Sequence, residues 1–143
     1  MSYLVGTDIG TLGTKSVLVT LEGKVLGEGF KEYDVITLKQ GWAEQWPKPW
    51  EDATYATIKM AVEQSGVDPK EIAGACISAL YGGSGIPVDR EYKPIRPCLI
   101  WADRRAIEEC RWVGNKIGEE ALFNVTGNVI DPSYGYTKMI WIR

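Results

Sequence analysis

A carboxylate followed by a glycine- and threonine-rich turn is the part of this sequence best suited to chemistry. Asp8 comes near the end of a short apolar run, 3–9, of the kind that forms a buried strand. Glycines let backbone N–H groups approach an anion closely, while hydroxyl groups add donors and a lysine adds positive charge. Asp8 could hold a hydrated Mg²⁺ beside that anion. The pattern predicts a phosphate-binding loop made of Gly10, Thr11, Gly13, Thr14 and Lys15.

This turn differs from the two common phosphate-binding motifs. Thr14 separates Gly13 from Lys15, so the turn is not a Walker A loop, and G-x-G-x-x-G does not occur in the chain. Spacing alone leaves a second interpretation open. In that interpretation the glycines serve an ordinary β-turn and Lys15 is a surface lysine.

Composition excludes several classes of protein. The chain has no histidine, which rules out histidine-based triads, histidine general bases and histidine metal ligands. Its formal net charge is −3, and it has no Lys/Arg run that would suit nucleic acid or a membrane surface. No apolar run approaches the ~20 residues that span a bilayer, and no signal peptide is recognisable. We therefore expect a cytoplasmic protein with no nucleic-acid and no membrane partner.

The cysteines give no sign of a metal site. Cys76, Cys98 and Cys110 are widely spaced and form no C-x-x-C pair. We expect three small, buried thiols in a reducing compartment.

Hydrophobic patterns predict an α/β fold. Three short apolar segments indicate an antiparallel β-meander, and a helix follows after a proline-rich aromatic loop. A later apolar run is expected to be a strand buried on both faces. Further helices then complete a mixed sheet with helices packed against it. The expected strands are 3–9, 16–21, 24–33 and 72–80, followed by two more at 86–89 and 99–101 that frame a turn. The expected helices are 49–65, 103–116, 119–125 and one from about 132.

Several segments together resemble one family. Residues 8–11 (DIGT), with Thr14 and Lys15, resemble the first phosphate loop of the superfamily of actin-like proteins, sugar kinases and heat-shock ATPases. The segments GWAEQ and LIWADRRA narrow the resemblance to the FGGY carbohydrate kinases, which include xylulose, ribulose and glycerol kinases. TGN and KMIW near the end are similar to that family's pattern as well. The resemblance covers essentially the whole chain in the right order.

That resemblance implies a ribonuclease H-like, actin-like ATPase domain that uses ATP and Mg²⁺ to phosphorylate a small-molecule sugar or polyol. It implies that Asp8 is the activity-critical carboxylate, near the metal and the transferring phosphate. Trp101 and Asp103 match a segment at the sugar site. An indole can cover the apolar face of a sugar while a carboxylate accepts its hydroxyl protons. Glu44 lies in a motif near the cleft and is a further candidate for sugar binding.

The specificity segment departs from the xylulose kinase pattern. Gly82 and Gly83 stand where xylulose kinases typically carry a Met-His pair that contacts the sugar. Only backbone groups could make that contact here, so another ketose or a polyol is a reasonable substrate. Plainer roles remain open nearby: Trp101 as a core residue, and Asp103 as an N-cap of the following helix. Arg104 and the arginine after it are expected to be solvated or ion-paired.

The resemblance also implies that residues 1–143 are the N-terminal portion of the first kinase domain. The family's general base, adenine site and second phosphate loop lie further along, so we expect the fragment to be inactive alone. The apolar helical pattern at 139–143 has no stop signal, which predicts truncation and self-association through an exposed edge. The rival interpretation is a non-catalytic actin-like module that binds phosphate weakly or pairs with a partner chain.

Overall fold

The structure is a computed structural model that describes residues 2–79 and 82–143. The predicted end of the last strand at Leu80 and the tyrosine that follows it lie outside the described residues. The chain divides into two compact units. Unit 1 contains residues 2–34 and 47–79, and unit 2 contains residues 35–46 and 82–143. Each unit is described by itself.

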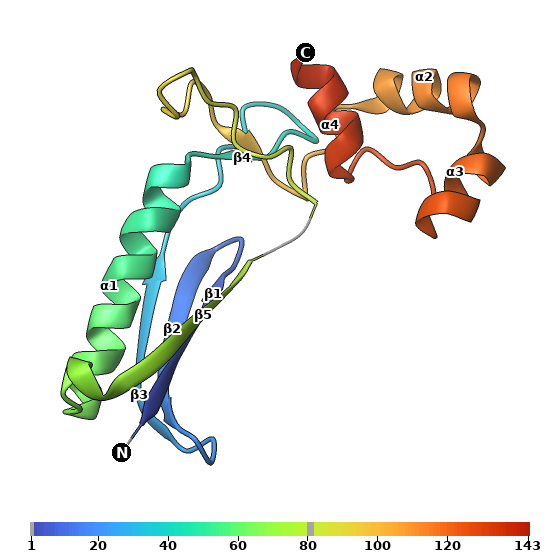
Figure 1. Ribbon diagram of the computed structural model, residues 1–143. Helices are drawn as coiled ribbons and strands as arrows, with labels where there is room; N and C mark the ends of the chain where they lie inside the picture. Colours follow the sequence, from blue (N-terminus) through green and yellow to red (C-terminus); the bar gives the residue numbers. More distant parts are fainter. Residues whose placement is uncertain (1, 80–81) are drawn as a thin grey trace. The chain divides into compact units, whose positions relative to one another are not determined.

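Unit 1 is a four-stranded mixed sheet in the order β3-β2-β1-β5 (Figure 1). Neighbouring strands β1, β2 and β3 are antiparallel, which confirms the predicted meander. The last strand, β5, lies beside β1 and runs parallel to it. The strands are β1 (Tyr3–Ile9), β2 (Gly13–Thr20), β3 (Val25–Glu32) and β5 (Ile72–Ala79).

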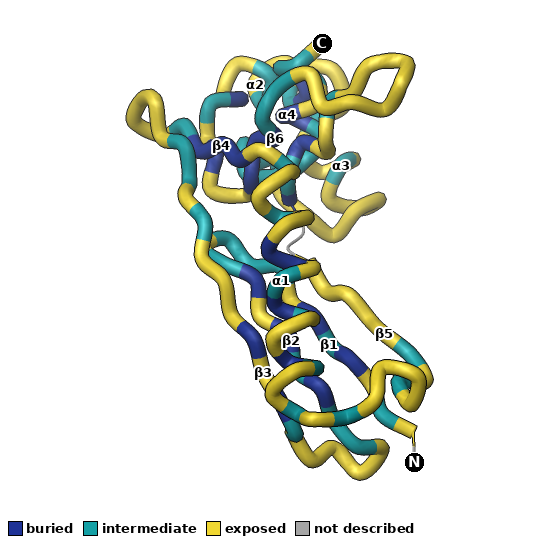
Figure 2. The backbone as a smooth tube through the Cα atoms, turned by 90° about the vertical axis from the view of Figure 1, so that its left-hand side faces the viewer, coloured by how far each residue is buried: buried dark blue, intermediate teal, exposed yellow. Residues whose placement is uncertain are grey.

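One face of this sheet is covered by the helix α1 (Pro47–Ser65) (Figures 1 and 2). Val5, Leu18 and Ala61 form the buried apolar centre between helix and sheet. Gly29 on β3 lets the helix approach closely, because a Cβ there would lie 2.3 Å from the Thr57 carbonyl oxygen. The helix begins two residues before the predicted start and ends at the predicted residue.

The prediction of a strand buried on both faces was wrong for β5. Five consecutive residues, 75–79, are exposed, and Cys76 is an exposed thiol rather than a buried one. The physical reason is position: β5 is at the edge of the sheet, and α1 packs against β1, β2 and β3 instead. An apolar run identifies a strand but not what covers it.

Unit 2 has little sheet and three helices in its described residues. Two short strands, β4 (Glu44–Gln45) and β6 (Cys98–Leu99), pair antiparallel. The helices α2 (Ile107–Ile117), α3 (Glu119–Thr126) and α4 (Gly135–Ile142) follow, in the predicted order. The N-terminal boundary of α2 lies four residues later than predicted, with Ala106 as its N-cap, so Asp103 is not the helix cap.

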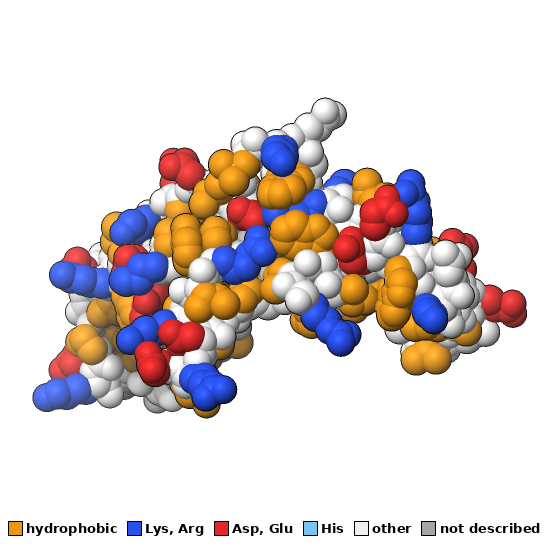
Figure 3. Space-filling view, turned by 90° about the horizontal axis from the view of Figure 1, so that it is seen from above, with side chains coloured by type: hydrophobic (Ala, Val, Ile, Leu, Met, Phe, Trp, Pro, Cys, Tyr) orange, Lys and Arg blue, Asp and Glu red, His pale blue; other side chains and the backbone are white. Residues whose placement is uncertain are grey.

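Acidic, basic and apolar side chains are interspersed on the surface drawn in Figure 3. This mixture agrees with a sequence of 16 Lys or Arg and 19 Asp or Glu residues. Among the described residues, no helix combines the length and apolar character needed to cross a membrane.

Candidate functional site

The predicted phosphate loop is the tight turn between β1 and β2. The Gly10 amide donates to the Gly13 carbonyl across the turn at 3.0 Å. The hydroxyl of Tyr33, the residue after β3, donates to the Gly10 carbonyl oxygen at 2.6 Å. That hydroxyl also lies 3.2 Å from Thr14 Oγ1, which is buried. Thr14 is therefore a buried residue that stabilises the turn, whereas Gly10, Thr11 and Gly13 are partly exposed.

Asp8 lies exposed beside this turn. It pairs across the strands with Lys15, and directly opposed residues of an antiparallel pair point to the same face of the sheet. No described residue hydrogen-bonds to the Asp8 side chain or forms an ion pair with it. The described residues also contain no group of three or more His, Cys, Asp or Glu that could hold a metal ion. An exposed carboxylate such as that of Asp8 can contact a hydrated Mg²⁺ through water.

Lys15 has a partner of its own in this structure. Its ammonium lies 3.2 Å from Glu28 Oε2, and both side chains are 57% exposed. An ion pair this exposed is weak and easily exchanged. Lys15 therefore keeps its charge available on the same sheet face as Asp8.

Three buried hydroxyl groups support the strands behind the turn. Ser16 Oγ lies 2.8 Å from both Thr7 Oγ1 and Thr57 Oγ1, and Thr57 donates onward to the Thr54 carbonyl. This neutral chain links β1, β2 and α1. Buried polar groups need such partners because leaving one unpaired costs about 1–3 kcal/mol.

In unit 2, the predicted sugar-binding carboxylates are held by arginines. Asp103 is fully buried and accepts hydrogen bonds from the Ala43 amide (2.7 Å), the Arg105 amide (3.1 Å) and the Arg105 guanidinium (2.6 Å to Nη2). Glu44 Oε1 lies 2.8 Å from Arg105 Nη1 and 3.0 Å from Arg96 Nη2. The expectation that Arg105 is ion-paired is confirmed.

Two indole rings complete this buried charge cluster. The Arg105 guanidinium lies 3.6 Å from the ring centroid of Trp42 and 4.8 Å from that of Trp141. Arg96 also lies over Trp141, at 5.1 Å. The planar guanidinium suits both bidentate carboxylate pairing and stacking on aromatic faces. Asp103 and Glu44 therefore hold three chain segments together, and neither carboxylate is exposed to a sugar.

Trp101 is placed differently, because its side chain remains 47% exposed. Gly82 passes beneath it: a Cβ at Gly82 would lie 3.3 Å from the Trp101 Cβ and 3.4 Å from the Ser133 carbonyl oxygen. The φ angle of Gly82 is +107°, a conformation that side chains rarely adopt. Gly83 adjoins Gly135, whose added Cβ would come within 2.5 Å of the Gly83 carbonyl oxygen. Side chains at Gly82 and Gly83 would therefore meet tight contacts at 3.3–3.4 Å, and at Gly82 also an unfavourable backbone conformation.

Arg104 ties the segment before α4 to this site. Its guanidinium donates to Asp131 (3.1 Å) and to Ser133 Oγ (2.9 Å). Partial burial acts to raise the pKa of Asp131, but hydrogen bonds from Ser133 and Arg104 outweigh it and hold that pKa below its usual value. Arg104 is thus ion-paired, as expected.

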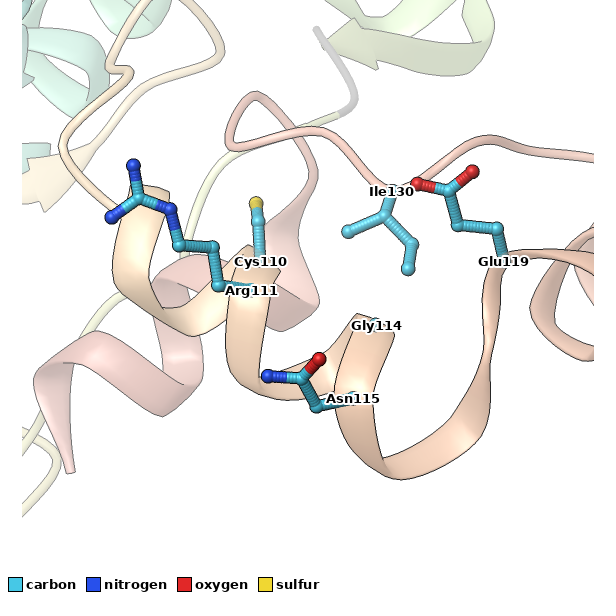
Figure 4. Close-up of a pocket in the computed structure, with 6 residues that line it drawn as sticks. All are labelled: Cys110, Arg111, Gly114, Asn115, Glu119 and Ile130. Atoms are coloured by element: carbon cyan, nitrogen blue, oxygen red, sulfur yellow. The ribbon is translucent and has the colours of Figure 1, made fainter.

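A separate hollow of about 550 Å³ lies between α2, the start of α3 and the segment after it (Figure 4). None of the residues that line it was predicted as a site residue, so we do not assign it to the sugar or phosphate site. The lining residues are Cys110, Arg111, Gly114, Asn115, Glu119 and Ile130.

A comparison of the sequence with models of protein families shows which family the chain belongs to. The N-terminal domain of the FGGY family of carbohydrate kinases matches residues 3–143. The chain belongs to this family. The resemblance drawn from the short motifs is therefore confirmed.

Individual relatives agree with the family. A xylulose kinase of Bacillus subtilis (strain 168) is 32% identical over 143 residues, covering 100% of this chain and 28% of the relative. A glycerol kinase of Rhizobium meliloti (strain 1021) is 31% identical over 141 residues, covering 98% of this chain and 28% of the relative. The FGGY chain described here thus spans 28% of the length of each of these two relatives.

The fold agrees as well. The crystal structure of a gluconate kinase from Lactobacillus acidophilus superposes with a TM-score of 0.87 at 27% identity, over 99% of this chain and 28% of that chain. The predicted class, α/β with a mixed sheet of the actin-like ATPase kind, is confirmed.

Three residues near the candidate FGGY sites were not predicted as site residues, although Lys138 begins the KMIW segment. Tyr33 holds the phosphate turn, and the hairpin register, which pairs Gly13 with Glu32, could have placed it there. Ser133 and Lys138 lie close to Gly82 only because distant segments fold together. No local pattern announces that proximity.

Proposed function

We propose that this chain is the N-terminal portion of an ATP-dependent sugar kinase. It would help to transfer the γ-phosphoryl group of ATP to a hydroxyl of a ketopentose or a similar sugar or polyol. The observation that carries the proposal is the match to the FGGY N-terminal domain across residues 3–143. Relatives named xylulose kinase and glycerol kinase support a sugar or polyol as the substrate class.

The turn of unit 1 is the proposed phosphate-binding segment. The glycines keep this part-exposed turn tight, with the Gly10 amide bonded to the Gly13 carbonyl, so that the turn leaves room for a phosphate group. Lys15 adds a positive charge that can leave Glu28. When bound, Mg²⁺ would neutralise charge on the phosphates. Asp8 would orient the water shell of that ion from its exposed position at the end of β1. Phosphoryl transfer depends mainly on such positioning and charge neutralisation.

Unit 2 contains the proposed sugar-binding residues. Trp101 would cover the apolar face of the sugar, and backbone groups of the Gly82–Gly83 segment would take the place of specificity side chains. Asp103 and Glu44, as buried partners of Arg105, would set the shape of the segments around Trp101 rather than bind hydroxyl groups themselves.

The general base is proposed to lie outside this chain. A base must come within hydrogen-bond reach of the sugar hydroxyl. Asp103 and Glu44 are buried in ion pairs, and the relatives extend well beyond the 28% of their length matched here. We therefore propose that the 143-residue chain alone does not catalyse phosphorylation of a sugar.

The test is a coupled ADP-release assay with ATP, Mg²⁺ and either D-xylulose, D-ribulose, glycerol or gluconate. The full product of the gene should phosphorylate at least one of these acceptors, and Asp8→Ala should abolish that turnover. The 143-residue chain should show none. Turnover by the short chain that Asp8→Ala removes would show that the rest of the kinase is dispensable. No turnover by the full product with any acceptor would favour the non-catalytic module instead.

A further inference from the structure

A lysine in α4 is buried, and no carboxylate among the described residues is in hydrogen-bond contact with it. Lys138 has no exposed surface, and its Nζ donates to the carbonyl oxygens of Gly82 (2.8 Å), Trp101 (3.4 Å) and Ser133. These acceptors come from three separate segments of unit 2. The first lies 56 residues from the lysine in the sequence.

The number of acceptors matches the chemistry of an ammonium group. A protonated lysine has three N–H donors and no acceptor, and here three carbonyl oxygens surround it. Burial lowers the pKa of Lys138 from 10.5 to about 8, so the amine keeps its proton at neutral pH. A buried charge is tolerated only when its donors are satisfied, so the three carbonyls must stay in place around it.

The three acceptors are backbone carbonyl oxygens that lie around the half-exposed indole of Trp101. Trp101 and Gly82 were predicted to bind sugar, and Gly82 runs directly beneath the Trp101 Cβ. Ser133 also receives a hydrogen bond on its hydroxyl from Arg104. Hydrogen bonds from Lys138 Nζ thus join three backbone segments, which contain Gly82, Trp101 and Ser133.

We propose that Lys138 is a positioning residue for the sugar site, holding the Gly82 and Trp101 backbones in register so that the exposed indole and the glycine amides face one sugar. This inference rests on the proposed function. Lys138 itself cannot touch the substrate, because no part of it is exposed. Its effect passes through the backbone that it binds.

The experiment compares Lys138→Met with a matched control, Lys116→Met. Lys116 is an exposed lysine in the last turn of α2, so its loss tests removal of charge alone. Binding of D-xylulose, glycerol and gluconate to the full product of the gene is followed by tryptophan fluorescence. We expect at least a tenfold weaker affinity for Lys138→Met and a change below twofold for Lys116→Met.

Chemical rescue separates positioning from packing. Lys138→Ala should lose sugar affinity as well, and n-propylammonium should restore it by placing a cationic donor in the vacated space. The neutral n-propanol, of similar size, should not. Equal rescue by both compounds would show that Lys138 only fills volume and would overturn the inference.

The outcomes distinguish this inference from the proposed function. If the full wild-type product binds none of the sugars, the proposed sugar site is wrong and Lys138 positions nothing. If the wild type binds and a folded Lys138→Met binds equally well, only the inference is wrong. If both Lys138 variants fail to fold, acetylation of Lys138 in the wild type is measured by mass spectrometry. Bound sugar should slow it at least threefold relative to Lys116, and an unchanged rate would overturn the inference.

Discussion

The two units of the chain are stabilised in opposite ways. Unit 1 relies on regular strand ladders, a helix against a sheet and a chain of neutral hydroxyls, and it leaves Asp8 exposed. Unit 2 has two strands of two residues each and is held by buried ions. Its carboxylates, Asp103 and Glu44, are enclosed by arginines and tryptophans.

This difference shows how far residue type can indicate function. Asp8 and Asp103 are both aspartates within motifs of the same family, yet only Asp8 is placed where a ligand can reach it. In unit 1 the strand ladders and the helix stabilise the fold, so the polar side chain of Asp8 is not needed for stability and can bind a ligand. In unit 2 the buried polar side chains of Asp103 and Glu44 themselves stabilise the fold.

The largest expected effect comes from Asp103→Asn. The change should leave the buried Arg105 poorly compensated and lower the free energy of unfolding by about 3–5 kcal/mol. The matched control, Asp8→Asn, should change it by less than about 0.5 kcal/mol, as exposed substitutions usually do. Urea unfolding followed by fluorescence measures both. A stable Asp103→Asn chain that has lost only sugar binding would show that Asp103 is a ligand after all.

A somewhat smaller effect is expected where α1 meets β3. Gly29→Ala should destabilise unit 1 by about 1–3 kcal/mol, because the new Cβ would lie 2.3 Å from the Thr57 carbonyl and force the helix away. Gly74→Ala on β5 is the control, since its Cβ would meet only the Leu4 side chain at 3.5 Å. Thermal unfolding by circular dichroism compares them. Equal melting temperatures would mean that the helix is less closely packed than described.

The buried lysine predicts a pH dependence confined to unit 2. Because burial lowers the pKa of Lys138 to about 8, the unfolded chain binds more protons between about pH 8 and 10.5. The free energy of unfolding should therefore rise with pH in that window, by at most about 1.4 kcal/mol per unit. The charged or titratable neighbours are Asp103, Cys98, Asp131 and Arg104.

The contribution of Lys138 is obtained by subtracting the pH dependence of the Lys138→Met variant from that of the wild type. Burial raises the pKa of Cys98, which gives a slope of opposite sign in the same range, so wild-type and Lys138→Met curves must be compared. Their difference should rise from pH 8 to 10. A flat difference would mean that the buried amine has an ordinary pKa.

The smallest effect belongs to the ion pair on the open face of unit 1. Lys15→Met should lower the free energy of unfolding by no more than about 1 kcal/mol, and added salt should shrink the loss, because both partners are 57% exposed. Thermal unfolding at low and high salt measures this. A loss above 2 kcal/mol would show that unit 1 depends on charge as unit 2 does.

Much of unit 1 could be predicted from the sequence, because its information is local. Three short apolar segments indicated the meander, and α1 ends at the predicted residue 65, just before Gly66 with its φ of +69°. Even Tyr33 follows from the hairpin register. The exposure of β5 did not follow, since an apolar run does not reveal which helix will cover it.

In unit 2 the element order was predictable but the side-chain roles were not. Asp103 reads equally well as a helix cap, a sugar ligand or an ion-pair partner. The choice depends on Arg105 being turned inward between Trp42 and Trp141, from segments far apart in the sequence. Such contacts are decided by tertiary packing and leave no periodic signal.

The contact between Trp42 and Trp141 has an optical consequence. Their rings lie 5.8 Å apart at an interplanar angle of 80°, close enough for their electronic transitions to couple. Coupled indoles produce a bisignate band in circular dichroism that vanishes when the rings separate. Unit 1 contains a single tryptophan, Trp50. The couplet is therefore a label-free signal for the assembly of unit 2, readable while the rest of the chain melts on its own.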